Sequence, residues 1–158
     1  MTLPDATVRF LRATADLGVA IEPREFPEGT KTARDAAAAI GCEVAQIVKS
    51  LVFVADGESV LAFVPGDLRL DVAKLANVAG AASVRRASLD EVRAATGYAA
   101  GGTPPFGHGA LLPTYADLGL RRHRQLWAAA GTPTTVFAIA LDDFERAAAP
   151  TWADLAES

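Results

Sequence analysis

The clearest pattern in the chain is a pair of apolar runs on either side of an Asp56-Gly57 dipeptide. Together they read "QIVKSLVFVADGESVLAFVPG" and cover residues 46–66. Both runs are rich in valine and other residues that favour strands. Because Asp-Gly suits the left-handed backbone of a two-residue hairpin turn, the segment predicts two antiparallel strands. We expect this hairpin to be central to the fold.

Helices are predicted where polar starting residues and closing glycines bound periodic segments. Five are expected: from a cap at Thr2 or Asp5 to about Leu17, with Gly18 as the stop; from a cap at Thr30 or Thr32 to Gly41; after Asp71, over "VAKLANVAG"; from a Ser88–Glu91 capping box to Gly97; and near "DDFERAAA", residues 142–149.

Further extended segments are predicted at "VAIEPREF" (19–26), "ASVRRA" (82–87), "LWAAAG" (126–131) and "TTVFAIA" (134–140), while Pro150 and the polar tail mark an end. Helices interleave with strands, yet a tight hairpin is also present, which favours a mixed sheet with flanking helices. A length of 158 residues, 51% of them hydrophobic, fits one domain over residues 1–158 with a single core.

Charge and composition narrow the function classes. A net charge of −4 and an isoelectric point near 5.1 argue against a tight, sequence-reading DNA binder, so nucleic-acid contact would need a local patch. The start lacks the layout of a secretory signal, and no apolar run approaches the roughly 18 residues of a membrane span. We expect a soluble, cytoplasmic protein without a disulfide, since Cys42 is the single cysteine. No metal or cofactor is expected, because the histidines and Cys42 show no recognisable ligand spacing.

Lys49 stands out because it interrupts an apolar strand. The two-residue period places it on one face with Leu51 and Phe53, and both faces of this strand are apolar. A buried, unpaired ammonium is costly, so an anionic or strongly polar group such as a ligand phosphate or ester oxygen should meet it. Alternatively, Lys49 lies at the end of the sheet and extends its charged head into water.

The segment "GYAAGGTPPFGHG", residues 97–109, is the second unusual feature. It lacks the Gly-Lys-Ser/Thr ending of a P-loop, and no helix clearly follows its glycines. Gly101 and Gly102 allow close approach to their backbone N–H groups, while Pro104 and Pro105 restrict the chain. These constraints predict a rigid turn that can face a ligand; a plain surface turn is the other interpretation.

Three other features have a functional and a simpler interpretation. Cys42 is expected to be a small hydrophobic residue, because no base for a thiol nucleophile stands near it in sequence. His108 could act as a base near pH 7 or make an ordinary polar contact. "RRHRQ", with Arg121, Arg122 and Arg124, could contact a phosphate backbone or be solvated surface.

Taken together, "QIVKSLVF", "LDVAKLANVAGAASVR", "ATGYAAGGTPPFGH" and "LWAAAGT" resemble, in this order, the YbaK/EbsC family of aminoacyl-tRNA deacylases. This family includes the editing domain inserted in bacterial prolyl-tRNA synthetases. The resemblance covers nearly the whole chain from about Glu22 onward. It implies one domain with a mixed, partly barrel-like sheet surrounded by helices.

The resemblance also implies a function. The family hydrolyses the ester that joins a wrong amino acid to the 3′ end of a tRNA, without a covalent nucleophile. Its essential lysine corresponds to Lys49, and its Gly-x-x-x-Pro motif to the segment from Gly101 to Pro105. The expected substrate-binding residues are Ser50, Gly101, Gly102, Thr103, Pro105, Phe106, Gly107, His108 and Gly131.

From this resemblance we expect a free-standing enzyme that edits in trans, acting on the 3′ acceptor end of tRNA-Pro that carries alanine or cysteine. It would work as a monomer or homodimer, with prolyl-tRNA synthetase as a possible partner. The chain departs from the family where a serine is common, at Ala129 and Pro104. Ala129 favours the alternative of a non-catalytic module that binds aminoacyl-tRNA or a synthetase. A hydrolase for a small nucleotide-linked ester is a third hypothesis.

Overall fold

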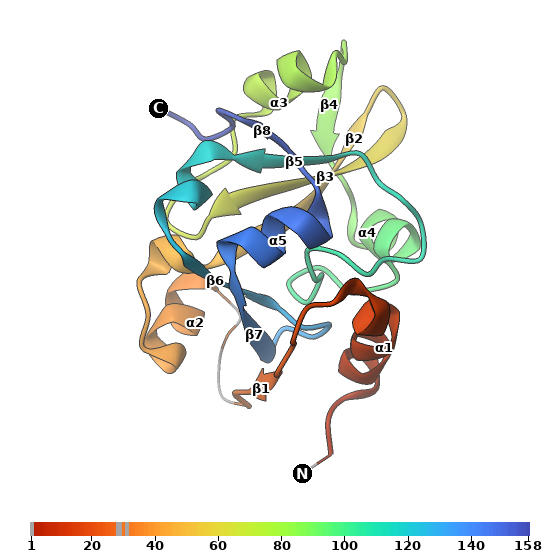
Figure 1. Cartoon of the computed structure of the whole chain (residues 1–158). Helices are drawn as coiled ribbons and strands as arrows, with labels where there is room; N and C mark the ends of the chain where they lie inside the picture. The colour runs from red at the N-terminus through yellow and green to blue at the C-terminus, as the bar shows by residue number, and fades with distance from the viewer. Residues whose placement is uncertain (1, 28–29, 31) are drawn as a thin grey trace.

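Two β-sheets form the centre of the computed structural model, which describes residues 2–27, 30 and 32–158 (Figure 1). One sheet has five strands in the order β4-β2-β3-β5-β8, and the other has three in the order β1-β7-β6. The strands are β1 (Arg24–Glu25), β2 (Val48–Ala55), β3 (Glu58–Pro65), β4 (Val84–Arg86), β5 (Thr114–Asp117), β6 (Gln125–Ala129), β7 (Thr135–Ala140) and β8 (Thr151–Ala153).

The predicted hairpin is confirmed as β2 and β3, which pair antiparallel over their full length. Asp56 and Gly57 both have positive φ, 49° and 85°, as a two-residue turn of this kind requires. The sheet is mixed as predicted, because β3 pairs with β5, and β5 with β8, in parallel. An isolated bridge between Ile47 and Trp127 joins the two sheets without closing a barrel.

In the described part of the chain, five α-helices and three short 3-10 helices surround the sheets. No helix of the described residues is long and apolar enough to cross a membrane. Their bounds are α1 (Asp5–Thr14), η1 (Ala15–Leu17), α2 (Ala33–Ile40), η2 (Val44–Gln46), α3 (Val72–Ala79), α4 (Leu89–Thr96), η3 (Leu118–Arg122) and α5 (Leu141–Ala148).

Most of the predicted helix ends are confirmed. Thr32 caps α2 and Asp71 caps α3, each accepting hydrogen bonds from backbone N–H groups of the first turn. The cap predicted for α1 is wrong: Pro4 holds that position and makes no side-chain hydrogen bond. Asp5 is instead the first helical residue, where its carboxylate faces the positive end of the helix dipole.

Two strands were not predicted from the sequence. β5 follows the glycine-rich loop (residues 97–109), and β8 lies in the tail that, with Pro150, was expected to mark an end. Both are short, and both are held by parallel pairing to strands that are distant in sequence. The extended segment 19–26 contains only the two-residue strand β1.

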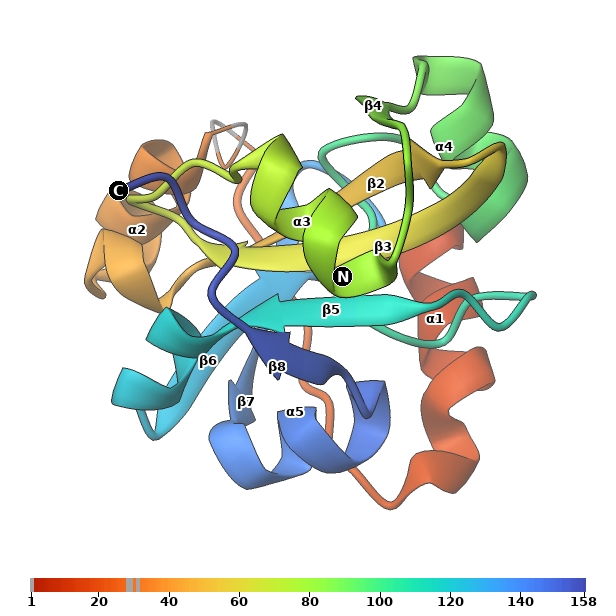
Figure 2. The same ribbon diagram turned by 90° about the horizontal axis from the view of Figure 1, so that it is seen from above.

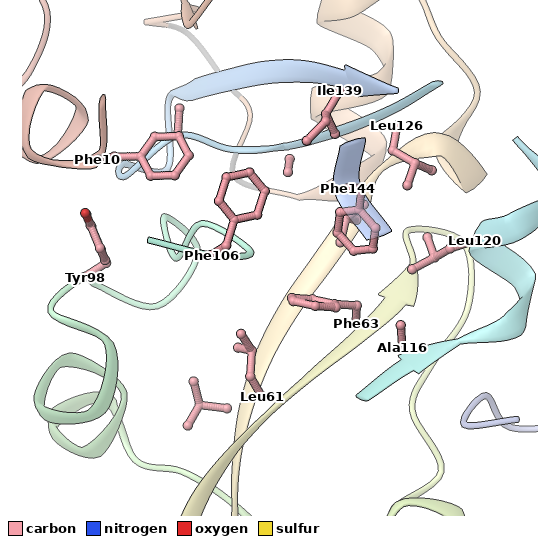
Figure 3. Packing of buried hydrophobic residues seen from close by; sticks show 14 of the residues in the cluster. Phe10, Leu61, Phe63, Tyr98, Phe106, Ala116, Leu120, Leu126, Ile139 and Phe144 are labelled. Atoms are coloured by element: carbon pink, nitrogen blue, oxygen red, sulfur yellow. The ribbon is translucent and has the colours of Figure 1, made fainter. Parts of the chain in front are cut away.

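The core lies between the sheets and the helices, and aromatic rings fill its centre. Phe10 of α1 lies 5.2 Å from Phe137 and 5.8 Å from Phe106, measured between ring centroids. Figure 3 shows Phe106 among these buried side chains, together with Phe63 and Phe144. The loop that carries Phe106 is therefore anchored in the core.

The capping box of α4 predicts a pH-dependent contribution to stability. Glu91 accepts hydrogen bonds from Arg85, at 2.7 and 2.8 Å, and from the Ser88 backbone, and its pKa is lowered to about 2, chiefly by Arg85. Because the folded pKa lies below the ordinary value of 4.5, the ionised Glu91 stabilises the fold above pH 4.5, and this is lost as pH falls towards 2. Glu91→Gln should lower the free energy of unfolding at pH 7, and the two proteins should converge near pH 2.

Urea denaturation at several pH values would measure this difference. Asp90→Asn is the matched control, since Asp90 stands next to Glu91 in the same helical turn and takes no part in the ion pair with Arg85. A constant difference between wild type and Glu91→Gln from pH 7 to pH 2 would contradict the prediction.

Candidate active site

A cavity of about 640 Å³ is lined by residues from both sheets. β2 and β6 form two of its walls, the first turn of α2 and the loop between β3 and α3 form others, and part of the glycine-rich loop completes it. Its lining includes Thr32, Arg34, Lys49, Ser50, Leu68, Arg69, Arg86, Gly101, Thr103, Trp127, Ala128, Ala129, Thr132, Thr135 and Glu157.

Lys49 is partly buried and lines this cavity. Its Nζ donates a hydrogen bond to the carbonyl of Leu68 at 2.8 Å. An ammonium has three N–H donors, so two remain for water or a ligand. Burial is the main cause of the lowered pKa of Lys49. The charges of Arg69 and Arg86 lower this pKa further, and the charge of Asp67 raises it. The lysine is thus only partly in water, and among the described residues it is not paired with a carboxylate. Both properties suit a group that binds an anionic ligand.

Ser50 lies on the opposite face of β2 but also borders the cavity. Its Oγ is buried and has no hydrogen-bond partner among the described residues. A buried hydroxyl without a partner costs about 1–3 kcal/mol, so a bound polar group would offset that cost. This geometry fits the sequence-based assignment of Ser50 to the substrate-binding set.

Two residues of the glycine-rich loop, Gly101 and Thr103, line the cavity. Gly101 has φ +84°, and Gly102 donates its N–H to the carbonyl of Ala99 at 3.0 Å. A Cβ added at Gly102 would lie 2.6 Å from the Cα of Thr132, so only glycine allows this approach. The hydroxyl of Thr103 donates to Ala99 as well. The loop is therefore a fixed turn rather than a slack linker.

The remaining predicted substrate-binding residues do not line the cavity. Phe106 packs in the core, and a Cβ at Gly107 would meet the Cγ2 of Thr14 at 2.8 Å. Gly131 is also buried, with φ +107°, and a Cβ added there would lie 2.8 Å from the carbonyl oxygen of Ala6. In the structure these residues shape the loop and its support, as does Pro105, which is buried beside Phe106.

His108 also lies outside the cavity lining. Its Nε2 donates to the carbonyl of Pro104 at 2.7 Å, and its ring lies 6.4 Å from that of Tyr98. Burial lowers its pKa, and the hydrogen bond to Pro104 partly offsets this. These contacts match the simpler of the two interpretations, an ordinary polar contact, and they place no base beside Lys49.

Sequence reasoning missed three cations of the cavity lining: Arg34, Arg69 and Arg86. With Lys49 they face one carboxylate in that lining, Glu157, so the cavity has an excess of positive charge. Each arginine looks like an ordinary surface residue in the sequence, because it stands at a helix start, in a turn or on a short strand. Only the pairing of β4 with β2, which sets Arg86 opposite Phe53, could have pointed to one of them.

The arginines predicted to contact tRNA lie elsewhere. Arg121, Arg122 and Arg124 are exposed and are not part of the cavity lining. Arg121 pairs with Glu145 at 3.3 Å and stacks over Trp152. Arg122 is the last residue of η3, and Arg124 stands just before β6.

Cys42 and metal binding complete the candidates from the sequence. Cys42 is partly buried in a small apolar cluster with Ile47 and Val44, and burial is the main cause of its raised pKa. These surroundings suit a small hydrophobic residue rather than a thiolate. Within the described part of the chain, no three His, Cys, Asp or Glu residues are grouped so that they could hold a metal ion.

Several known proteins are similar to this chain in sequence and in fold. A family model described as the aminoacyl-tRNA editing domain matches residues 27–147. A proline–tRNA ligase of Geobacter sp. (strain M21) is 42% identical over 92 residues, which are 58% of this chain and 16% of the ligase. EbsC of Enterococcus faecalis, named as a candidate Cys-tRNA(Pro)/Cys-tRNA(Cys) deacylase, is 34% identical over 107 residues, which are 67% of this chain and 65% of EbsC.

A solved structure shows how far the likeness extends in space. This crystal structure of a candidate trans-editing enzyme for prolyl-tRNA synthetase matches with a TM-score of 0.94 and 39% identity, over 99% of this chain and 100% of the other. The match confirms the predicted fold, and the family model confirms the resemblance seen in the sequence. The chain belongs to the family of aminoacyl-tRNA editing domains.

Proposed function

We propose that the protein is a hydrolase that edits in trans: it cleaves the ester of tRNA-Pro mischarged with a small amino acid, alanine or cysteine. One observation carries the proposal, namely that Lys49 and the fixed turn at Gly101–Thr103 border the same cavity. Family membership supports the reaction class. The names of the matching ligase, of EbsC and of the solved structure support the tRNA and the editing role.

The positive lining fits the end of a tRNA. Arg34, Arg69 and Arg86 would meet phosphates near the acceptor end, where neutralised charge supplies affinity that falls with salt. Lys49 would hold a phosphate or polar oxygen of the terminal adenosine and so orient the ester. In a partly buried site such a charge acts more strongly than in water.

In the reaction, water attacks the aminoacyl carbonyl carbon, the bond to the ribose oxygen breaks, and that oxygen leaves with a proton. The backbone N–H groups of Gly101 and Thr103, two residues that border the cavity, would hold the carbonyl as negative charge develops on its oxygen. We assign no residue as the base: in this proposal a hydroxyl or side chain of the substrate itself takes the proton. His108 stays outside this role because it does not border the cavity.

Small residues form part of the cavity lining. Ala128 and Ala129 of β6 and Gly101 leave little bulk there, and Thr132 and Thr135 add hydroxyls. Such a wall suits a small aminoacyl group, and the unpartnered Oγ of Ser50 offers it a hydrogen bond. Where the family often has serine, Ala129 of β6 contributes no hydroxyl, so in our proposal Ser50 of β2 makes the polar contact to the aminoacyl group instead.

We further propose that Arg122 and Arg124 contact the tRNA outside the cavity, with Arg121 as a weaker participant because Glu145 already pairs with it. The protein would act in the cytoplasm, as a monomer or homodimer, and would cooperate with prolyl-tRNA synthetase. This cooperation is inferred from the match to proline–tRNA ligases, of which the chain covers 16%.

A panel of mischarged tRNAs tests the proposal directly. Alanyl- and cysteinyl-tRNA-Pro should lose their amino acid in the presence of the protein at least tenfold faster than in buffer, while correctly charged prolyl-tRNA-Pro should not. Acid-gel separation of charged and free tRNA would measure both rates. Saturable tRNA binding without deacylation would instead identify a non-catalytic binding module. Hydrolysis of short adenosine esters with no benefit from tRNA would point to a nucleotide-linked ester.

A further inference from the structure

The segment after β8, Asp154–Ser158, lies beside the loop that leads from β3 into α3 (Figure 2). We call residues 154–158 the closing segment. Two backbone hydrogen bonds join it to the loop, one from Asp71 N to the Leu155 carbonyl at 2.7 Å and one from Glu157 N to the Arg69 carbonyl at 2.8 Å. Together they form the isolated antiparallel bridge between Leu70 and Ala156.

The same loop supplies the hydrogen-bond acceptor of the cavity lysine. Leu68, which directly precedes Arg69, receives the Nζ of Lys49 on its carbonyl. Lys49 has a long, flexible side chain, so a fixed acceptor determines where its ammonium stands. The closing segment therefore binds the residue next to this acceptor, because Glu157 N donates to Arg69 while Lys49 donates to Leu68.

A buried carboxylate anchors the closing segment. Asp117, at the end of β5, is only 4% exposed. Its Oδ1 accepts hydrogen bonds from Leu155 N at 2.8 Å and Ala156 N at 3.1 Å, and its Oδ2 accepts one from Gly119 N at 2.9 Å. Gly119 is also close to the loop, since a Cβ added there would lie 3.9 Å from Leu68. Asp117 thus holds two segments that border the loop at Leu68: the closing segment, and the start of η3 at Gly119.

We propose that Asp117 is a positioning residue for Lys49: it fixes the closing segment, which fixes the loop whose Leu68 carbonyl holds the ammonium of Lys49 in the cavity. A carboxylate accepts N–H groups on both of its oxygens, whereas an amide accepts on one oxygen only and an apolar side chain accepts none. The kinetic part of this proposal rests on the function proposed above, whereas the structural part does not.

Lys74 of α3 supports the arrangement from the other side. Its Nζ donates to the carbonyl of Ala156 at 2.7 Å and to Asp154 at 3.0 Å. The carbonyl contact is partly buried, while the side chain of Asp154 is 69% exposed. Lys74→Met should therefore loosen the closing segment, and Asp154→Ala, which removes only an exposed ion pair, is the matched control.

Lysine NMR can test the structural part. The chain has three lysines, Lys31, Lys49 and Lys74, so protein labelled with ¹³Cε-lysine gives few signals, and Lys49→Ala and Lys74→Met assign them. In Asp117→Asn we expect the Lys49 signal to titrate at higher pH than in wild type, because the loosened loop admits water. If the Asp117 carboxylate acted on Lys49 only through its negative charge, its loss would instead move the Lys49 titration to lower pH. A shift to lower pH, or no shift, would overturn the proposal.

Kinetics test the consequence for the reaction. Asp117→Asn and Lys74→Met should lower kcat for deacylation about tenfold, since the ammonium is displaced. They should change KM less than kcat, because only Arg69 of the three cavity arginines lies in the loosened loop, whereas Arg34 and Arg86 lie on other elements. Asp154→Ala should keep the wild-type kcat. Variants that lose stability but retain kcat would show that the closing segment only supports the fold. If the wild type does not deacylate any tRNA, the proposed function fails, while the lysine titration still decides the positioning of Lys49.

Discussion

Lys49→Ala is expected to lower kcat/KM for deacylation of mischarged tRNA by about 10²–10³-fold, the usual loss when a preorganised charge is removed from an active site. The ammonium is partly buried, borders the cavity and is held by the Leu68 carbonyl. No other lysine borders the cavity within the described residues, so no equivalent donor replaces it. Single-turnover deacylation would measure the loss independently of product release.

Two control variants separate a local role from general attraction of tRNA. Lys49→Arg keeps the charge but changes the shape of the donor, and we expect it to recover part of the rate. Arg12→Ala removes one exposed cation of α1 that is not part of the cavity lining, and it should leave the rate unchanged. The mechanism is wrong if Lys49→Ala keeps the full rate, or if Arg12→Ala causes an equal loss.

Gly102→Ala should give the second large effect. The added Cβ would lie 2.6–2.9 Å from the backbone of Thr132, where neither side can yield easily because both are main chain. Relief of the clash must move the turn away from the segment at Thr132, and Gly101 and Thr103 would move with it. We expect a loss of about 1–3 kcal/mol in the free energy of unfolding and at least a tenfold loss of activity.

Gly109→Ala is the matched control for this change. Gly109 lies in the same loop region, has no atom within 4 Å of an added Cβ and lacks a positive φ. Alanine there should change neither stability nor rate. Denaturation and deacylation measured on the two variants would test the argument; it fails if Gly102→Ala behaves like Gly109→Ala.

Local signals explain which parts of the fold were predictable. The Asp56-Gly57 turn, the cap at Asp71 and the capping box at Ser88 depend on backbone conformations and hydrogen bonds within a few residues. Such interactions can be predicted from a few consecutive residues. β5 and β8 could not be found in this way, because each is a strand only through parallel pairing with a distant partner. The cap of α1 was misassigned because Pro4 fits the helix start without a side-chain hydrogen bond.

The residues of the candidate site also fall into those that local sequence reveals and those that depend on packing. Lys49 was visible because a charge on an apolar strand breaks a local pattern, and Gly101 because glycine and proline restrict the chain. Phe106 shows the limit: the sequence places it in the ligand-facing loop, whereas the structure buries it between Phe10 and Phe137. The direction of a loop side chain depends on what packs against it.

By itself, the sequence determined the hairpin, most helix ends, the lysine strand, the rigid turn and the resemblance to the editing family, because each rests on neighbouring residues or on a motif. Only the tertiary structure decided that Arg69 and Arg86 border the cavity with Lys49, that His108 does not, and that Asp117 holds the closing segment. The physical reason is that charges, carbonyls and N–H groups act over a few ångströms, and folding brings together groups as distant in the chain as Lys49 and Glu157.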